Sequence, residues 1–297
     1  MQEYFTQWRL RFRKSAFAWH ALNTPARIRW LSSPRRLAPA ERGAVAALQA
    51  CGIAIVHASA LTGPELVDEL WRMAEARWQS CQGSVSPSRT GTKGSYLLDL
   101  WEGEHVLEPG NPFLQFSLST PILNVVNAYL GMYAKFREFF LQATVPRPGT
   151  ETAIASQRWH ADPDDRKLVK VFLYLNDVDE TAGPFTYIRY SHRGGKWRKL
   201  FPYAPKIKSR HPDPALIERM IPKEDIVVAA GQAGTVIFCD TAGIHRGGYA
   251  TARERIMYTS VYTTPASSLP TRFSYPPDFK PAFLAAQARW AVSPNRL

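Results

Sequence analysis

Two histidines and one aspartate in this sequence have the types and spacing of a metal site. His160 and Asp162 stand two residues apart, and His245 follows after a long gap. Residues i and i+2 of an extended segment point to the same side, so the first two can face one ion while the third comes from another strand. Two imidazoles and one carboxylate are the facial ligand set typical of non-haem Fe(II) sites, which leaves coordination positions open for catalysis.

A cation downstream of His245 would suit a dicarboxylate co-substrate. Arg255 lies ten residues after His245 and begins a β-rich segment, so its guanidinium could bind a distal carboxylate through two hydrogen bonds. Arg253 lies on the same face at alternating spacing and is the competing candidate. The alternative is that His160 and His245 are ordinary buried or turn residues. The ordered combination of His-x-Asp, a long gap with several strands, His and then Arg is more specific than any part alone.

Three further polar residues are weaker candidates for the same site. Gln157 precedes the metal-type histidine by three residues and could line the site. Lys170 and Tyr174 share one face of a predicted strand, so either could contact a co-substrate or a substrate. The alternative for this pair is a lysine at the edge of the barrel and a tyrosine in its core.

The overall composition indicates a globular protein. The chain is 45% hydrophobic and 21% charged, which is ordinary for a folded domain with a core. No apolar run approaches the roughly 20 residues that span a bilayer, and the first residues lack the apolar stretch of a secretory signal. Cys51, Cys81 and Cys239 lie far apart and lack metal spacing, which predicts reduced thiols in a cytoplasmic protein.

Residues 1–43 form a basic arm, with nine Lys or Arg residues against two acidic residues. Aromatic residues at near-helical spacing predict an amphipathic helix whose basic residues lie largely off the aromatic face. These aromatic residues are Phe5, Trp8, Phe12 and Trp19. Pro25 and Pro34 are expected to prevent one continuous helix through Trp30. The arm could dock on the main domain or make a peripheral contact with the inner face of a membrane, since both kinds of helix share this pattern.

Short strands dominate the sequence after residue 133, and helices precede them. Pro64 and Pro121 stand in the first turns of two expected helices, and Gly131 ends the second. The β-rich segments are bounded by turn residues without long helices between them, which favours an antiparallel sandwich or barrel in a mainly β (α+β) fold with flanking helices. The expected strands are Gly52–Ala58, Phe139–Val145, Leu168–Leu175, Phe185–Ile188, Gly234–Cys239 and Arg255–Thr263.

The expected organisation has three parts: the arm at 1–43, a catalytic domain at 44–264 and a C-terminal extension at 265–297. The polar, Gly- and Ser-rich segment 82–97 is expected to be a loop. A basic insertion at 193–225 contains one short predicted helix, and its cations would suit an anionic group on the substrate. These cations are Lys196, Arg198, Lys199, Lys206, Lys208 and Arg210.

Several stretches between residues 48 and 263 resemble the motifs of the phytanoyl-CoA dioxygenase family. They are Gln157–Asp162; Leu175–Val178 with Gly183–Phe185 and Ser191–Gly195; Gly234–Phe238 with His245–Gly248 and Arg255; and Gly52–Ala58 with the capped helix that follows it. The resemblance implies a double-stranded β-helix (jelly roll, cupin-like) that uses Fe(II), 2-oxoglutarate and O2. It implies that His160, Asp162 and His245 are the metal ligands and that Arg255 is the 2-oxoglutarate anchor.

The activity that this resemblance implies is dioxygenation. The enzyme would hydroxylate an aliphatic C–H of a small or lipid-linked metabolite and release succinate and CO2. Related halogenating enzymes have a small residue in place of the carboxylate, so Asp162 favours hydroxylation. One alternative is a non-catalytic β-barrel protein whose arm binds a membrane or nucleic acid, and another is a cupin-like metalloenzyme of a different reaction type. The intact metal set argues against the first, which makes nucleic acid an unexpected partner, and Arg255 argues against the second.

Overall fold

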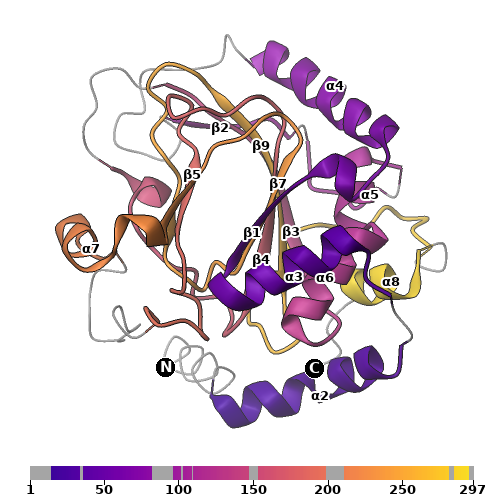
Figure 1. Ribbon diagram of the computed structural model, residues 1–297. Helices are drawn as coiled ribbons and strands as arrows, with labels where there is room; N and C mark the ends of the chain where they lie inside the picture. The colour runs from indigo at the N-terminus through magenta and orange to yellow at the C-terminus, as the bar shows by residue number, and fades with distance from the viewer. Residues whose placement is uncertain are drawn as a thin grey trace, which may run out of the picture.

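Two antiparallel sheets form the centre of the molecule, and helices cover the outer face of the larger one (Figure 1). The computed structural model describes residues 15–33, 36–81, 96–101, 103–108, 110–146, 153–198, 211–280 and 284–293. The arrangement is a double-stranded β-helix without a fully closed barrel. The expected mainly β fold with flanking helices is therefore confirmed.

The larger sheet has six strands in the order β1-β7-β4-β9-β3-β2. Their bounds are β1 Ile53–His57, β2 Leu97–Asp99, β3 Lys135–Thr144, β4 Leu168–Tyr174, β7 Thr235–Cys239 and β9 Arg255–Thr263. The long β3/β9 ladder runs from Lys135 opposite Thr263 to Thr144 opposite Arg255, with an irregularity between Phe136 and Glu138. This register places the side chain of Arg255 next to that of Thr144.

The smaller sheet has three strands in the order β6-β5-β8. Their bounds are β5 Phe185–Ile188, β6 Ile226–Ala229 and β8 His245–Arg246. An isolated antiparallel bridge joins His160 to His245 at the free edge of β8. Strand β6 was not expected from the sequence, because it has only four residues and most of them are partly exposed.

Five helices pack against the outer face of the larger sheet or beside one another on that side of the molecule (Figure 1). They are α3 Pro39–Cys51, α4 Pro64–Cys81, α5 Pro112–Leu118, α6 Thr120–Leu130 and α8 Ala286–Val292. The expected helices at Pro64 and Pro121 are confirmed, and Gly131 ends α6 with a positive φ of 71° that favours glycine. None of the described helices is long and apolar enough to cross a bilayer.

The N-terminal arm contains one continuous helix, α2 Ala16–Leu31, with Pro25 inside it. The prediction that Pro25 would interrupt the helix before Trp30 is therefore wrong. A proline inside a helix costs about 3 kcal/mol, and α2 offsets this cost by burying Trp19, Ala26 and Trp30 in the main core. Docking of this part of the arm on the main domain is confirmed, while residues 1–14 and Pro34 lie outside the described residues.

Two other sequence expectations fall partly outside the described residues. Most of the expected loop at 82–97 lies outside them, and its last residue, Leu97, begins β2. The short helix expected in the basic insertion is confirmed as α7 Pro214–Met220, which packs beside the smaller sheet through Ile217. The basic residues at 199, 206, 208 and 210 also lie outside the described residues.

Candidate active site

Backbone pairing brings the three predicted metal ligands together. The backbone N–H of His160 donates to the carbonyl of His245 at 2.9 Å, and the reverse bond measures 2.8 Å. The N–H of Asp162 donates to the carbonyl of Thr241 at 2.7 Å. One ligand atom from each of His160, Asp162 and His245 lies within 4.8 Å of the other two. The expected convergence of distant segments on one point is confirmed.

Both imidazoles are oriented for metal binding through Nε2. His160 Nδ1 lies 2.8 Å from the carbonyl of Arg158, and His245 Nδ1 lies 3.0 Å from the carbonyl of Gly243. A carbonyl only accepts, so each Nδ1 must carry the proton and each Nε2 has a free lone pair. Burial lowers the pKa of His160, and burial together with the neighbouring His160 lowers the pKa of His245 to about 3. Both rings are therefore neutral at physiological pH, as metal binding requires.

The third ligand, Asp162, is ionised. Burial alone would raise its pKa, but the ammonium of Lys170 and then His245 hold the pKa well below its usual range. Lys170 Nζ lies 2.8 Å from Asp162 Oδ2, and His245 Nε2 lies 3.8 Å from the same oxygen. An ionised carboxylate with two neutral imidazoles matches the donor set of a divalent non-haem iron site, so the residues present fit Fe(II).

The two candidate anchor residues occupy different environments. Arg255 is only 4% exposed, donates through Nη1 to the carbonyl of Gly183 and through Nη2 to Thr144 Oγ1 at 3.0 Å. Its Nε has no hydrogen-bond partner among the described residues. Arg253 lies on the surface, where Nη1 pairs with Asp179 Oδ2 at 3.1 Å. The interior position belongs to Arg255, so the geometry does not favour Arg253 as a ligand for a buried carboxylate.

The weaker candidates, Gln157 and Tyr174, are both buried, and each is hydrogen-bonded to backbone atoms. Gln157 Oε1 accepts from the backbone N–H of Ile154 at 3.4 Å, within its own turn. The hydroxyl of Tyr174 donates to the carbonyl of Ala229 at 2.8 Å and accepts from the N–H of Phe185 at 3.0 Å. Burial raises the pKa of Tyr174, although Arg255 is close enough to oppose this shift. Tyr174 thus lies in the core of the barrel and next to Arg255.

Sequence reasoning named Lys170 as a possible contact for a co-substrate, but it missed the ion pair of Lys170 with Asp162 and missed Glu138. Lys170 points inward from β4, because its neighbours Val169 and Val171 pack in the outer core. Glu138 points inward from β3, and its Oε2 lies 3.3 Å from Nε of Arg272. The signal that could have found them is the presence of a charged residue at an inward position of an otherwise apolar strand.

The arm contributes a further contact that sequence reasoning missed. The indole Nε1 of Trp19 donates to Asp165 Oδ1 at 2.8 Å. Asp165 Oδ2 accepts from the backbone N–H of Thr264 at 2.8 Å and from its hydroxyl at 2.7 Å. Helix α2 is thereby bonded to the segment that carries Asp162, three residues away.

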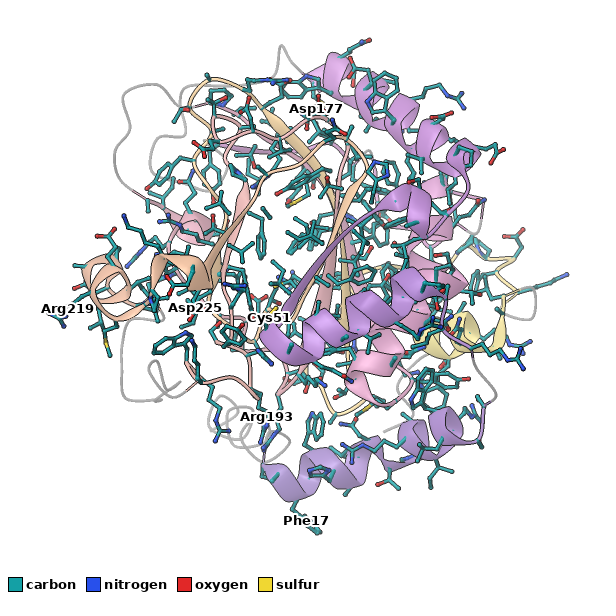
Figure 2. All side chains as sticks on the ribbon, in the orientation of Figure 1. Phe17, Cys51, Asp177, Arg193, Arg219 and Asp225 are labelled. Carbon is teal, nitrogen blue, oxygen red and sulfur yellow. The ribbon has the colours of Figure 1, made fainter. Side chains whose placement is uncertain are left out.

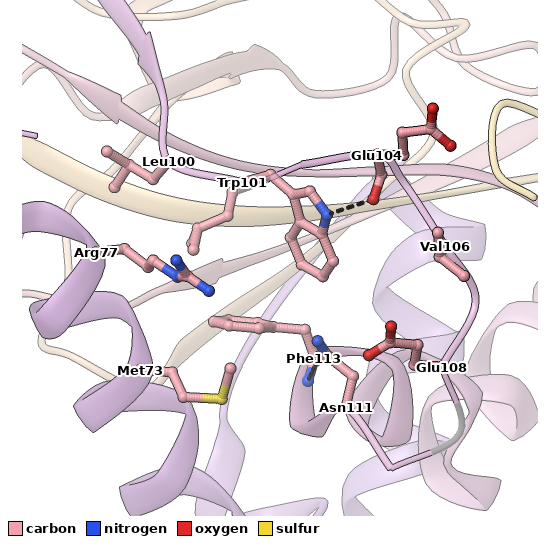
Figure 3. Close-up of a pocket in the computed structure, with 10 residues that line it drawn as sticks. Met73, Arg77, Leu100, Trp101, Glu104, Val106, Glu108, Asn111 and Phe113 are labelled. Atoms are coloured by element: carbon pink, nitrogen blue, oxygen red, sulfur yellow. Dashed lines mark hydrogen bonds between the residues drawn. The ribbon is translucent and has the colours of Figure 1, made fainter. Parts of the chain in front are cut away.

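A cavity of about 240 Å³ lies among residues of the helix-covered side of the larger sheet (Figure 3). Its lining includes Leu100, Phe113 and Leu141, which belong to the outer core. The ring of Trp101 covers one side, and its indole N–H donates to the carbonyl of Glu104 at 3.4 Å. The lining contains none of the predicted site residues, so this cavity is not part of the candidate active site.

The chain is similar in fold to solved iron oxygenases. EctD from S. alaskensis, determined with 2-oxoglutarate and 5-hydroxyectoine, gives a TM-score of 0.57 at 18% identity over 87% of this chain and 90% of that chain. The epimerase SnoN, determined with Fe3+, alpha ketoglutarate and nogalamycin RO, gives 0.54 at 15% identity over 78% and 86%. The carbocyclase SnoK from nogalamycin biosynthesis gives 0.52 at 15% identity over 80% and 90%. At these identities the likeness establishes the fold.

The family is established by the sequence itself. Residues 46–257 match the phytanoyl-CoA dioxygenase (PhyH) family, which is more than two thirds of the chain. A comparison with curated proteins gave no match. The family match agrees with the observed fold and with the His-Asp-His set. The chain therefore belongs to the phytanoyl-CoA dioxygenase (PhyH) family of Fe(II)/2-oxoglutarate-dependent oxygenases.

Proposed function

We propose that this enzyme hydroxylates an aliphatic C–H bond of a small or lipid-linked metabolite and releases succinate and CO2. The observation that carries the proposal is the convergence of two neutral imidazoles and one ionised carboxylate in the interior of the fold. Fe(II) with 2-oxoglutarate and O2 supplies the oxidising chemistry when bound. His160, Asp162 and His245 would hold the iron on one face and leave the other face for the co-substrates.

Arg255 is the residue we propose as the anchor of the distal carboxylate of 2-oxoglutarate. Its guanidinium is buried. Arg255 Nη2 would lie 3.7 Å from a Cβ added to Gly247, and Gly247 is only two residues after the predicted metal ligand His245. Thr144 and Gly183 fix the two Nη atoms of Arg255 in position. A buried guanidinium favours a planar carboxylate that can accept two hydrogen bonds.

The proposal is tested by adding 2-oxoglutarate to the anaerobic Fe(II)-loaded protein and recording the weak visible charge-transfer band. The wild-type protein should show the band, and Asp162→Ala should abolish it. Arg255→Ala should require a much higher 2-oxoglutarate concentration for the same absorbance, whereas the matched surface variant Arg253→Ala should behave as wild type. A wild-type protein without the band, or with a band that depends on Arg253 and not on Arg255, would refute the assignment.

Hydroxylation is proposed ahead of other outcomes because Asp162 occupies the position that halogenating enzymes leave to chloride. The solved relatives include an epimerase and a carbocyclase, so the reaction type has to be read from a product. The wild-type enzyme, incubated with a metabolite library and 18O2, should yield a product with one added 18O atom together with succinate. A product without added oxygen would show that the enzyme catalyses another 2-oxoglutarate-dependent oxidation and not hydroxylation.

The basic insertion gives little support for an anionic substrate, because Lys196 already forms an ion pair of 2.7 Å with Asp225.

A second proposal concerns the outer face of α2, which suits an anionic membrane surface. Phe17, Ile28 and Leu31 are 80%, 62% and 74% exposed, and at 100° per residue they share one face, opposite the buried Trp19 and Trp30. The ring of Phe17 extends away from the body of the molecule (Figure 2). Arg27 and Arg29 flank this face on its two sides. Apolar side chains flanked by arginines are typical of helices that lie on anionic bilayers. With three free cysteines, we propose a cytoplasmic enzyme that contacts the inner face of a membrane.

The membrane contact is tested by flotation with phosphatidylglycerol vesicles and with phosphatidylcholine vesicles. Deletion of the whole arm would expose the core that Trp19 and Trp30 fill, so the triple variant Phe17→Ser, Ile28→Ser and Leu31→Ser is the better probe. This variant should stay behind when wild type floats with the anionic vesicles. Trp71→Ser, which removes a half-exposed indole from α4, is the matched control and should float as wild type does. Equal flotation of the triple variant and wild type would reject the contact.

A further inference from the structure

Lys170 places a second cation at the metal end of the barrel. Its side chain is one-fifth exposed, and Nζ lies 2.8 Å from Asp162 Oδ2. That oxygen is also the one that faces His245 Nε2, at 3.8 Å. A metal bound by Asp162 and His245 would therefore approach the same carboxylate that the Lys170 ammonium contacts.

A metal at this position would leave the positive charge of Lys170 less well balanced than it is in the metal-free protein. The single charge of Asp162 would then be shared by a dication and an ammonium, and two cations this close repel each other strongly in a protein interior. The ammonium has three N–H donors, and the contact with Asp162 uses one of them. The charges of two other carboxylates, Asp164 and Glu138, also act on Lys170, and Glu138 is already in contact with Arg272. An anion that arrives with the metal would therefore stabilise Lys170.

The inner face of β4 shows where such an anion would lie. Lys170, Phe172 and Tyr174 alternate on this face, with Lys170 at Asp162 and Tyr174 near Arg255. At about 3.3 Å per residue the two ends are about 13 Å apart along the strand. Phe172 lies between them and packs on Phe185 with ring centroids 4.6 Å apart. Lys170 at the metal ligands (the metal end) and Arg255 beside Tyr174 (the deep end) therefore lie on either side of the apolar ring of Phe172.

We propose that Lys170 binds the carboxylate of the co-substrate that enters the coordination sphere of the metal, while Arg255 binds its distal carboxylate. The inference rests on the proposed function and adds a residue to it. A dicarboxylate that lies along Phe172 places one carboxylate at the metal end and one at the deep end. Lys170 then exchanges part of its contact with Asp162 for the incoming carboxylate, and the charge of each carboxylate is matched by its own cation.

The two roles are separated by two ligands. Oxalate chelates a metal through the same kind of carboxylate as 2-oxoglutarate but has no distal group for Arg255. In calorimetric titrations of the Mn(II)-loaded protein, Lys170→Met should weaken both ligands by about 10-fold to 100-fold, as expected for loss of a charge-assisted hydrogen bond. Arg255→Ala should weaken 2-oxoglutarate by a similar factor and leave oxalate within about twofold. Lys170→Arg should retain most of the oxalate affinity, and Arg253→Ala, which removes a surface cation, should change neither.

Each result decides the question. Unchanged oxalate affinity in Lys170→Met would overturn the proposal. A loss of affinity for Mn(II) itself that accounts for the whole effect would also overturn it, because Lys170 would then only hold Asp162 in place; Mn(II) is therefore titrated alone first. If the wild-type protein binds oxalate in a Lys170-dependent way but does not bind 2-oxoglutarate, the role of Lys170 stands and the proposed function fails.

Discussion

The two ends of the barrel's inner face are held in different ways. At the metal end, His160 and Asp162 lie on a short segment that is joined to its neighbours by an isolated bridge and a few backbone hydrogen bonds. At the deep end, Arg255 begins a nine-residue strand and faces Thr144 in the long β3/β9 ladder. The metal end thus joins an irregular segment to the two-residue strand β8, whereas the deep end is part of the long regular ladder.

Because the two ends are held differently, substitutions at each end should have different effects on metal binding and on the stability of the fold. A change at the metal end removes a ligand or its support and leaves most of the sheet intact. A change at Arg255 removes a buried guanidinium whose partners, Gly183 and Thr144, would lose their hydrogen bonds. Buried acceptors without partners cost stability. Variants at the metal end should therefore lose function with little unfolding, and variants at the deep end should lose both.

The largest effect is expected for Asp162→Ala. Loss of the carboxylate leaves two metal ligands and removes the ion-pair partner of Lys170. The affinity for Mn(II) should therefore fall by more than about 100-fold, beyond the loss that is typical when only a hydrogen-bond partner of a ligand is changed. Succinate release should fall to background. The measurement is a Mn(II) titration beside a circular dichroism melt. Wild-type Mn(II) affinity in this variant would show that Asp162 does not bind the metal, and it would contradict the proposed difference between the two ends.

The next effect is expected for Arg255→Ala. The unfolding free energy should fall by about 1–3 kcal/mol because buried partners are left unsatisfied. The 2-oxoglutarate concentration at half-saturation should rise by about 10-fold to 100-fold. Arg253→Ala serves as the control in urea unfolding and in the titration, since its pair with Asp179 is exposed and should contribute less than about 1 kcal/mol. Equal effects of the two variants would contradict the difference between interior and surface.

A smaller effect is expected for the dependence of the unfolding free energy on pH in the metal-free protein. His245 has a pKa of about 3 in the folded protein, lowered mainly by burial, against about 6.5 in an unfolded chain. Between these values the unfolded chain binds a proton that the folded chain does not. The unfolding free energy should therefore fall as the pH drops below about 6.5, by up to about 1.4 kcal/mol per pH unit from this residue. Urea unfolding in EDTA at pH 7, 6 and 5 should show a shallower fall for His245→Gln, and parallel curves would count against a neutral, buried His245.

The smallest effect is expected for Trp19→Phe, which tests whether the arm supports the metal end. The variant keeps the buried ring but removes the bond from Nε1 to Asp165. Asp165 keeps its two hydrogen bonds from Thr264, so loss of the bond from Trp19 should lower the unfolding free energy by about 0.5–1.5 kcal/mol and weaken Mn(II) binding by a few-fold. Urea unfolding and the Mn(II) titration measure the two effects. Full retention of Mn(II) affinity would limit the arm to a role in stability.

The sequence predicted the metal end better than the deep end. His160, Asp162 and His245 could be found because i and i+2 positions share a side and because the order of motifs is specific. The choice between Arg255 and Arg253 could not be made, since both residues fit the alternation. Only the register of β9 against β3 and the pair between Arg253 and Asp179 separate them, and register is a tertiary property.

Strands β1, β3, β4, β5, β7 and β9 and helices α4, α6 and α7 were also predictable, whereas the short strands β2, β6 and β8 and the N-terminal helix were less so. Local propensity placed a break at Pro25, whereas burial of Trp19 and Trp30 keeps α2 continuous. The ion pair between Lys170 and Asp162 joins β4 to a loop, so sequence spacing gave no sign of it. The division of the chain at residue 43 stays a prediction, and α2 and α3 both contribute to the core of the domain that follows.

The central claim is that one ferrous ion is bound by His160, Asp162 and His245 together. The most direct test is an anaerobic crystal structure with Fe(II) and 2-oxoglutarate, with the iron located by anomalous scattering. The account predicts iron at about 2.0–2.2 Å from Nε2 of both histidines and from a carboxylate oxygen of Asp162, with the distal carboxylate of 2-oxoglutarate at Arg255. Iron bound elsewhere, or bound without one of these three side chains, would contradict it.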